Sequence, residues 1–262
     1  MSRHRVLSFV TALFMITLVL PGCSQGPSEE EQAKAALNEQ LAAIEQSYQD
    51  LQATRTEFDA ATARLAELEA MSQLDDEQRA EMDALPARID ELATARDAAF
   101  ETVQNQLAEF LNVALNNFPQ APETARALEI YSREGLLTAA DTVLKSGDYS
   151  KAIDQLRSIQ SYYESVDLEP YPELEATIAS YDDWRYITQE RFDEVKKGMT
   201  KDEVRAIAGI PYYRNIQVDE QRGVETWLYR KRDGGAAAFY FKTNNDKVYA
   251  TKFDAVKTKV VE

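Results

Sequence analysis

The sequence predicts a mostly helical α+β chain: a long antiparallel coiled-coil hairpin, a helical middle domain, and a C-terminal module of two helices and a three-stranded antiparallel sheet. Three observations support this. Apolar residues recur every seven positions over much of residues 31–118, and a glycine-centred turn joins two helical runs within residues 119–189. Three strand-like runs with turn residues between them lie within residues 190–262.

Residues 1–22 have the layout of a secretory signal peptide, since arginines precede an apolar run that is shorter than the ~20 residues of a membrane-spanning helix. The segment Leu20-Pro21-Gly22-Cys23 resembles the lipobox of bacterial lipoproteins. That resemblance implies cleavage before Cys23, a covalent lipid (acyl chains such as palmitate) on this residue and no other cofactor. With Ser24 next in the chain, it also implies a periplasmic location on the outer membrane. Residues 23–30 then serve as anchor and linker; the alternative is an uncleaved anchor with an incidental cysteine.

Cleavage removes the only histidine, His4, and lipidation removes the only thiol. Such a chain cannot build a Ser-His-Asp or Cys-His system or a zinc site with histidine and cysteine ligands. Adjacent carboxylates such as Asp75-Asp76 lie at predicted helix starts, where they cap backbone N–H groups. We therefore expect no catalytic residue, no metal site and no enzymatic activity.

Charge differs sharply along the chain, which has 29 Lys+Arg and 45 Asp+Glu. Residues 24–118 hold 6 basic and 20 acidic residues, whereas residues 191–262 hold 15 and 11. A basic end on an acidic chain is compatible with contact with anionic lipid headgroups, with an acidic partner, or with no specific contact. A secreted, anchored chain would meet no nucleic acid.

The heptad seam of residues 31–118 runs through Leu37, Ile44, Leu51, Phe58 and Leu65 and continues after a break at residues 72–78. Asp75 with Gln78 three residues later predicts a capping box and a second helix that folds back on the first. This pairing sets apolar positions opposite one another, for example Ile44 with Val103. A parallel dimeric coiled coil remains open.

Two details of this hairpin stay unsettled by sequence. Arg55, Thr62 and Arg96 occupy seam positions, and the two arginines are expected to reach acidic neighbours. Pro86 either kinks the second helix or lies in the first turn of a helix that begins near Ala84.

Residues 119–189 predict a helical domain. The run Gly147-Asp148-Tyr149, followed by Ala152, resembles the turn between the two helices of a tetratricopeptide unit. A single unit cannot bury its own apolar face, so the pair is expected to pack on neighbouring helices. The many tyrosines of residues 162–186 fit either a core or a peptide-binding surface.

The C-terminal module, residues 190–262, opens with Gly198-Met199-Thr200, where Gly198 ends one helix and Thr200 caps the next. Gly209 and Pro211 end that second helix. Strand-like runs follow at 224–232, 236–243 and 247–256, with glycines or asparagines between them.

This order of motifs, with Trp227-Leu228-Tyr229 and the aromatic run at 239–241, resembles the BamE family, also called SmpA/OmlA lipoproteins. The resemblance implies an accessory subunit of the machinery that inserts β-barrel proteins into the outer membrane, with anionic lipid and other assembly subunits as partners. For Gly198, Met199, Thr200, Gly209 and Pro211 it implies mainly structural roles.

Contact residues are expected on the sheet. Its strands alternate in facing, so one face packs on the helices and the other is free to present aromatic rings to lipid or a partner. The candidate contacts are Trp227 and Tyr229, with the basic run Arg230, Lys231 and Arg232; a solvated strand end explains the basic run equally well.

These observations together predict a lipid-anchored, non-catalytic scaffold or accessory factor in outer-membrane (β-barrel protein) assembly or envelope integrity. The alternative is a periplasmic structural spacer or binding protein that acts through its coiled coil, with peptidoglycan or an inner-membrane partner.

Overall fold

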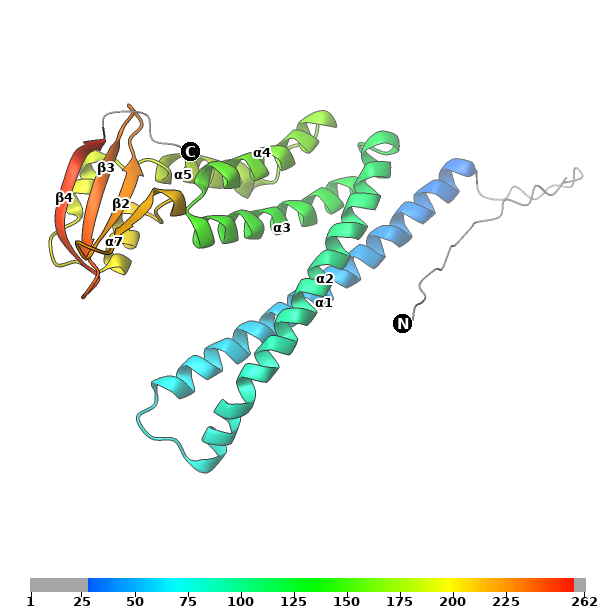
Figure 1. The fold of residues 1–262 in the computed structure, drawn as a ribbon. Helices are drawn as coiled ribbons and strands as arrows, with labels where there is room; N and C mark the ends of the chain where they lie inside the picture. The colour runs from blue at the N-terminus through cyan, green and yellow to red at the C-terminus, as the bar shows by residue number, and fades with distance from the viewer. Residues whose placement is uncertain (1–27, 257–262) are drawn as a thin grey trace, which may run out of the picture. The chain divides into compact units, whose positions relative to one another are not determined.

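The structure, a computed structural model, describes residues 28–256. It divides into two units, one ending at Ala36 and the other starting at Leu37. The first unit contains the start of helix α1 (Glu29–Ala70), where Ser28 and Glu31 exchange side-chain and backbone hydrogen bonds as a cap. All later elements, which Figure 1 draws, belong to the second unit.

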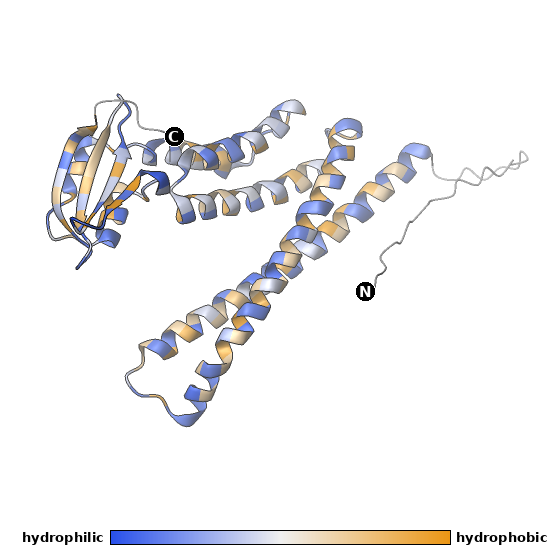
Figure 2. Cartoon of the chain, in the orientation of Figure 1, coloured by the Kyte–Doolittle hydropathy of each residue, from blue (hydrophilic) through white to orange (hydrophobic). Residues whose placement is uncertain are grey.

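Helices α1 and α2 (Asp76–Asn117) form the predicted antiparallel hairpin. Ion pairs join Arg64 to Glu81 at 2.8 Å and Arg88 to Glu57 at 3.0 Å, so the two helices run in opposite directions. Hydrophobic residues recur between hydrophilic ones along both helices (Figure 2). The seam residues that are buried include Leu37, Ile44 and Leu51 from α1, and Leu92, Val103 and Phe110 from α2.

The turn of the hairpin settles the position of Pro86. Asp75 accepts a hydrogen bond from the backbone N–H of Gln78 at 2.8 Å, and the Gln78 side chain accepts one from Asp75 at 3.0 Å. This capping box fixes the start of α2 at Asp76. Pro86 therefore lies inside α2, and the interpretation in which it sits in a first turn near Ala84 is wrong.

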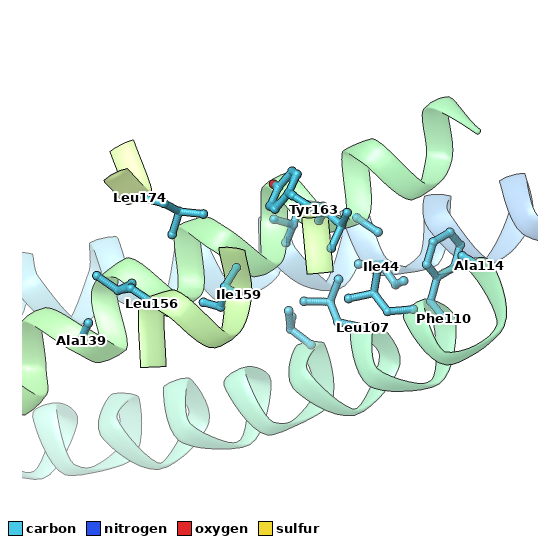
Figure 3. Close-up of a cluster of buried hydrophobic side chains, with 14 of the residues drawn as sticks. Ile44, Leu107, Phe110, Ala114, Ala139, Leu156, Ile159, Tyr163 and Leu174 are labelled. Atoms are coloured by element: carbon cyan, nitrogen blue, oxygen red, sulfur yellow. The ribbon is translucent and has the colours of Figure 1, made fainter. Parts of the chain in front are cut away.

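The middle of the chain forms α3 (Pro122–Ser146), α4 (Tyr149–Ser165) and α5 (Pro172–Trp184). Gly147 ends α3 in the left-handed conformation, with φ 64°, and Asp148 caps α4 by accepting from the Lys151 N–H at 2.9 Å. The three helices share one apolar cluster with the end of the hairpin. Figure 3 shows part of it, where Leu156, Ile159 and Leu174 lie in the same cluster as Ile44, Leu107 and Phe110.

The C-terminal module contains α6 (Gln189–Glu194), α7 (Lys201–Ala208), a 3₁₀ turn η1 (Tyr213–Asn215) and a sheet. Its strands are β1 (Ile216–Asp219), β2 (Val224–Arg230), β3 (Ala236–Lys242) and β4 (Lys247–Val256), antiparallel in the order β1-β2-β3-β4. The α+β class is confirmed, but the sheet has one strand more than predicted. The extra strand, β1, is only four residues long, so the alternation of Ile216 and Val218 with polar residues is too short to identify it from the sequence.

Candidate functional site

Trp227 and Tyr229 face the helices. In the β2–β3 register Trp227 lies opposite Phe239 and Tyr229 opposite Ala237, so these residues share one face of the sheet. That face packs on α6 and α7 through Phe192 and Val204. Trp227 is 1% exposed and Tyr229 6% exposed. Both residues were predicted to contact lipid or a partner. The structure instead places both rings in the core, because alternate residues of β2, including these two, point toward the helices.

The basic run at the end of β2, Arg230 to Arg232, forms its contacts with other residues of this chain. Lys231 binds Asp254 at 2.7 Å, and this hydrogen bond raises the pKa of the Lys231 ammonium. Arg232 binds Asp182 of α5 at 3.0 Å. The guanidinium groups of Arg230 and Arg232 lie 5.4 and 4.7 Å from the ring centroid of Tyr186. The predicted basic cluster thus helps to hold the module against the end of α5.

The Gly-Met-Thr motif ties the segment before α7 to β4. The Gly198 N–H donates to the Val248 carbonyl at 2.8 Å, and the Val248 N–H donates to the Met199 carbonyl at 2.9 Å. Thr200 caps α7 in a capping box with Glu203, whose carboxylate accepts from the Thr200 N–H at 2.7 Å. That backbone hydrogen bond lowers the pKa of Glu203. Thr200 caps α7 as expected, but α6 ends at Glu194 with its cap at Val195, so Gly198 lies in the following turn and does not end a helix as predicted.

Gly209 and Pro211 meet the turn between α3 and α4. The Ile210 N–H donates to the Tyr149 hydroxyl at 3.2 Å, and the Tyr229 hydroxyl donates to the Gly209 carbonyl at 2.9 Å. Gly209 has φ 84°, and a β-carbon there would stand 3.0 Å from the Tyr149 hydroxyl oxygen. The segment after α7 therefore both ends that helix and packs against the turn between α3 and α4.

The opposite face of the sheet carries an aromatic and basic group that we call the outer patch: Tyr240, Lys242, Tyr249 and Lys252. Lys252 lies opposite Ala238 in the register, and the Lys242 ammonium lies 4.5 Å from the ring centroid of Tyr249. Tyr249 is 37% exposed. Within residues 28–256 no carboxylate forms an ion pair with either lysine.

Residues 185–261 match the family model of the outer membrane protein assembly factor BamE domain. The C-terminal module is a BamE-like domain. No curated protein and no solved structure matches the chain. The match covers the module and leaves the hairpin and the helices α3, α4 and α5 outside it.

The outer patch of the BamE-like domain is the feature that sequence interpretation missed. Alternation predicts that one face of β2 and β3 is covered, but it does not say which one. The tertiary structure decides the face, because Val204 and Ala208 of α7 pack on the side of the sheet that carries Trp227.

Two findings concern what the described residues lack. None of the helices in residues 28–256 is both long and apolar enough to cross a bilayer. In the same range, no group of three or more histidine, cysteine, aspartate or glutamate side chains is placed to hold a metal ion. Cys23 and the predicted signal peptide lie outside the described residues.

Proposed function

We propose that this chain is a lipid-anchored, non-catalytic accessory factor of the outer membrane that acts in β-barrel protein assembly or envelope integrity through its BamE-like domain. The observation that carries the proposal is the match of residues 185–261 to the assembly-factor domain. The non-catalytic part rests on the residue inventory, since the only histidine and the only cysteine fall in or beside the predicted signal peptide.

The outer patch is the proposed contact with anionic lipid headgroups at the periplasmic face. Each lysine close to an anionic surface contributes roughly 1 kcal/mol, and tyrosine rings suit an interface that is apolar on one side and wet on the other. Lys242 and Lys252 have no carboxylate partner within residues 28–256, so their charges are available. The run Arg230–Arg232 is a weaker candidate because Asp182 and Asp254 already neutralise it.

The lipid contact is tested with the full-length mature chain, purified in detergent and offered to vesicles with and without phosphatidylglycerol. Lys242→Glu/Lys252→Glu should weaken binding to the anionic vesicles and leave binding to neutral vesicles unchanged. The matched control is Lys34→Glu/Lys145→Glu, which makes the same charge change elsewhere. Equal binding by both double variants would contradict the lipid contact.

The anchor is tested by mass. We expect the mature protein to begin at Cys23 and to carry acyl chains, which at ~0.8 kcal/mol per buried methylene would hold it on the membrane. Intact-mass measurement of the membrane-extracted protein gives the answer. A free thiol at Cys23 would contradict the anchor.

A second candidate function acts through the hairpin, as a spacer or binding protein. The observation that favours it is that the ion pairs and side-chain hydrogen bonds of residues 60–92 stay within α1, α2 and their turn. Deletions in cells distinguish the two functions. Loss of residues 185–262 should lower outer-membrane β-barrel protein levels and detergent resistance. If that deletion has no effect while loss of residues 37–118 does, the assembly role fails.

A further inference from the structure

A cleft lies between the end of α2, the middle of α3 and the end of α4, outside the BamE-like domain. Its volume is about 720 Å³, within the range that holds a small molecule. We call it the neutral cleft. Its walls are Gln104, Ala108, Leu111, Asn112, Leu115, Asn116, Tyr131, Ser161, Tyr162, Ser165 and Val166.

None of these wall residues is charged, although charged residues make up 28% of the chain. The cleft between the hairpin and α3 differs, since Asp59, Arg96 and Asp97 are among the residues that line it. A charged ligand in the neutral cleft would find no counter-ion among the wall residues. The composition of the walls therefore favours an uncharged ligand.

Two tyrosines give the neutral cleft an aromatic wall. The rings of Tyr131 and Tyr162 meet edge to face with centroids 5.9 Å apart, and Tyr162 is 40% exposed. The Tyr131 hydroxyl, like any tyrosine hydroxyl, is protonated at neutral pH and able to donate, and burial raises its pKa further. Neither hydroxyl has a hydrogen-bond partner among residues 28–256.

Amide side chains supply donors and acceptors on the facing wall. Gln104 and Asn112 use neither their amide nitrogen nor their amide oxygen on a protein partner within residues 28–256. Asn116 donates to the Asn112 carbonyl at 2.8 Å, and Ser165 donates to the Tyr162 carbonyl at 2.7 Å, so their remaining capacity is mainly to accept. Leu111, Leu115 and Val166 supply apolar surface between these polar groups.

We propose that the neutral cleft binds an uncharged saccharide. Sugar rings present apolar C–H faces that stack on aromatic rings, and their hydroxyl groups both donate and accept hydrogen bonds, as amide side chains do. An apolar ligand would gain nothing from Gln104 and Asn112. The saccharide site does not depend on the assembly role, because no residue of the BamE-like domain lines it.

The test uses the full-length mature chain and two neutral trisaccharides, chitotriose and maltotriose, in saturation-transfer NMR and calorimetry. We expect saturable binding of at least one of them in the millimolar range, which corresponds to about −4 kcal/mol. Their comparison separates an N-acetylated cell-wall glycan from another neutral sugar.

The variant Tyr162→Ala should weaken binding by about tenfold or more, as the loss of a stacking ring predicts. Gln104→Ala, at a half-buried position outside the apolar core, supplies a second variant if Tyr162→Ala unfolds. Tyr213→Ala, which removes a 50% exposed ring elsewhere, is the matched control and should bind like the unchanged chain. The proposal is overturned if neither sugar saturates below ~20 mM, a free energy of about −2.3 kcal/mol. It is also overturned if Tyr162→Ala and Gln104→Ala, both folded by circular dichroism, bind as tightly as Tyr213→Ala.

Discussion

Arg55 of α1 and Glu134 of α3 form a two-pronged ion pair, with both nitrogen–oxygen distances at 2.7 Å and the Glu134 side chain fully buried. A second pair, Arg126 with Glu45 at 2.8 Å, joins the same two helices. The hairpin is thus fastened to the middle helices by directional charged contacts as well as by the shared apolar cluster. Their geometry fixes where α3 sits along α1.

The Arg55–Glu134 pair predicts a large asymmetry between variants. Arg55→Ala leaves a buried carboxylate without its partner and should lower the free energy of unfolding by roughly 3 kcal/mol, whereas Arg55→Met/Glu134→Leu should recover most of that loss. Denaturant unfolding of the purified chain measures both. Arg88→Ala breaks an exposed pair and is the control, with an expected loss below about 1 kcal/mol. Similar losses of unfolding free energy for Arg55→Ala and Arg88→Ala would contradict a stabilising role of the Arg55–Glu134 pair.

The contact between Gly147 and the segment after α7 predicts a position-specific effect of alanine. A β-carbon on Gly147 would stand 2.3 Å from the Pro211 carbonyl oxygen, which is backbone and cannot move aside easily. Gly198 also has a positive φ, at 92°, but a β-carbon there meets nothing within 4 Å. We expect Gly147→Ala to cost about 1–3 kcal/mol more than Gly198→Ala, which carries the backbone strain alone.

Thermal unfolding of the two glycine variants, followed by limited proteolysis near residue 186, measures this difference. We expect faster cleavage of Gly147→Ala because the turn between α3 and α4 would no longer pack closely against the BamE-like domain. Equal stability and equal cleavage of the two variants would show that the contact contributes nothing.

Tyr229 predicts a loss of stability at alkaline pH. Burial raises its pKa well above the ordinary value of 10.0. The folded chain therefore keeps the Tyr229 proton while the unfolded chain releases it near pH 10, so the stabilisation is complete below pH 10 and falls as pH rises above it, by up to ~1.4 kcal/mol per pH unit.

Tyr229→Phe isolates this effect, because it removes the ionisation together with the hydrogen bond to the Gly209 carbonyl. Below pH 10 the variant should be about 1 kcal/mol less stable than the unchanged chain. Between pH 10 and 11.5 the gap should close or reverse. Unfolding curves in denaturant at each pH measure it, and a gap that stays constant across this range would contradict the assignment.

The sequence predicts the helices and most of the sheet because their signals are local. The heptads through Leu37, Ile44 and Leu51, the capping boxes at Asp75 and Thr200, and the left-handed turn at Gly147 are all found in the structure. Each depends on residues within a few positions of one another. Strand β1 was not predicted because an alternation over only four residues is too short a signal.

Contacts between residues far apart in the sequence could not be predicted from local patterns. Arg55 occupies the hairpin seam and was expected to reach an acidic neighbour, but its partner Glu134 lies 79 positions away in another helix. Trp227 and Tyr229 were assigned to an exposed face because alternation leaves open which face is covered. Arg232 pairs with Asp182, which lies 50 positions earlier in the sequence. The basic run was predicted to be a contact surface, whereas it forms contacts within the fold.

The most direct test of the assembly role places a photo-crosslinking amino acid at Tyr249, in the outer patch, in cells that produce the full-length chain. We expect crosslinks to membrane lipid and to subunits of the barrel-assembly machinery, and neither product with the probe at Tyr162. Crosslinks to assembly subunits from neither position, with lipid products equal at both, would contradict a role of the BamE-like domain in outer-membrane assembly.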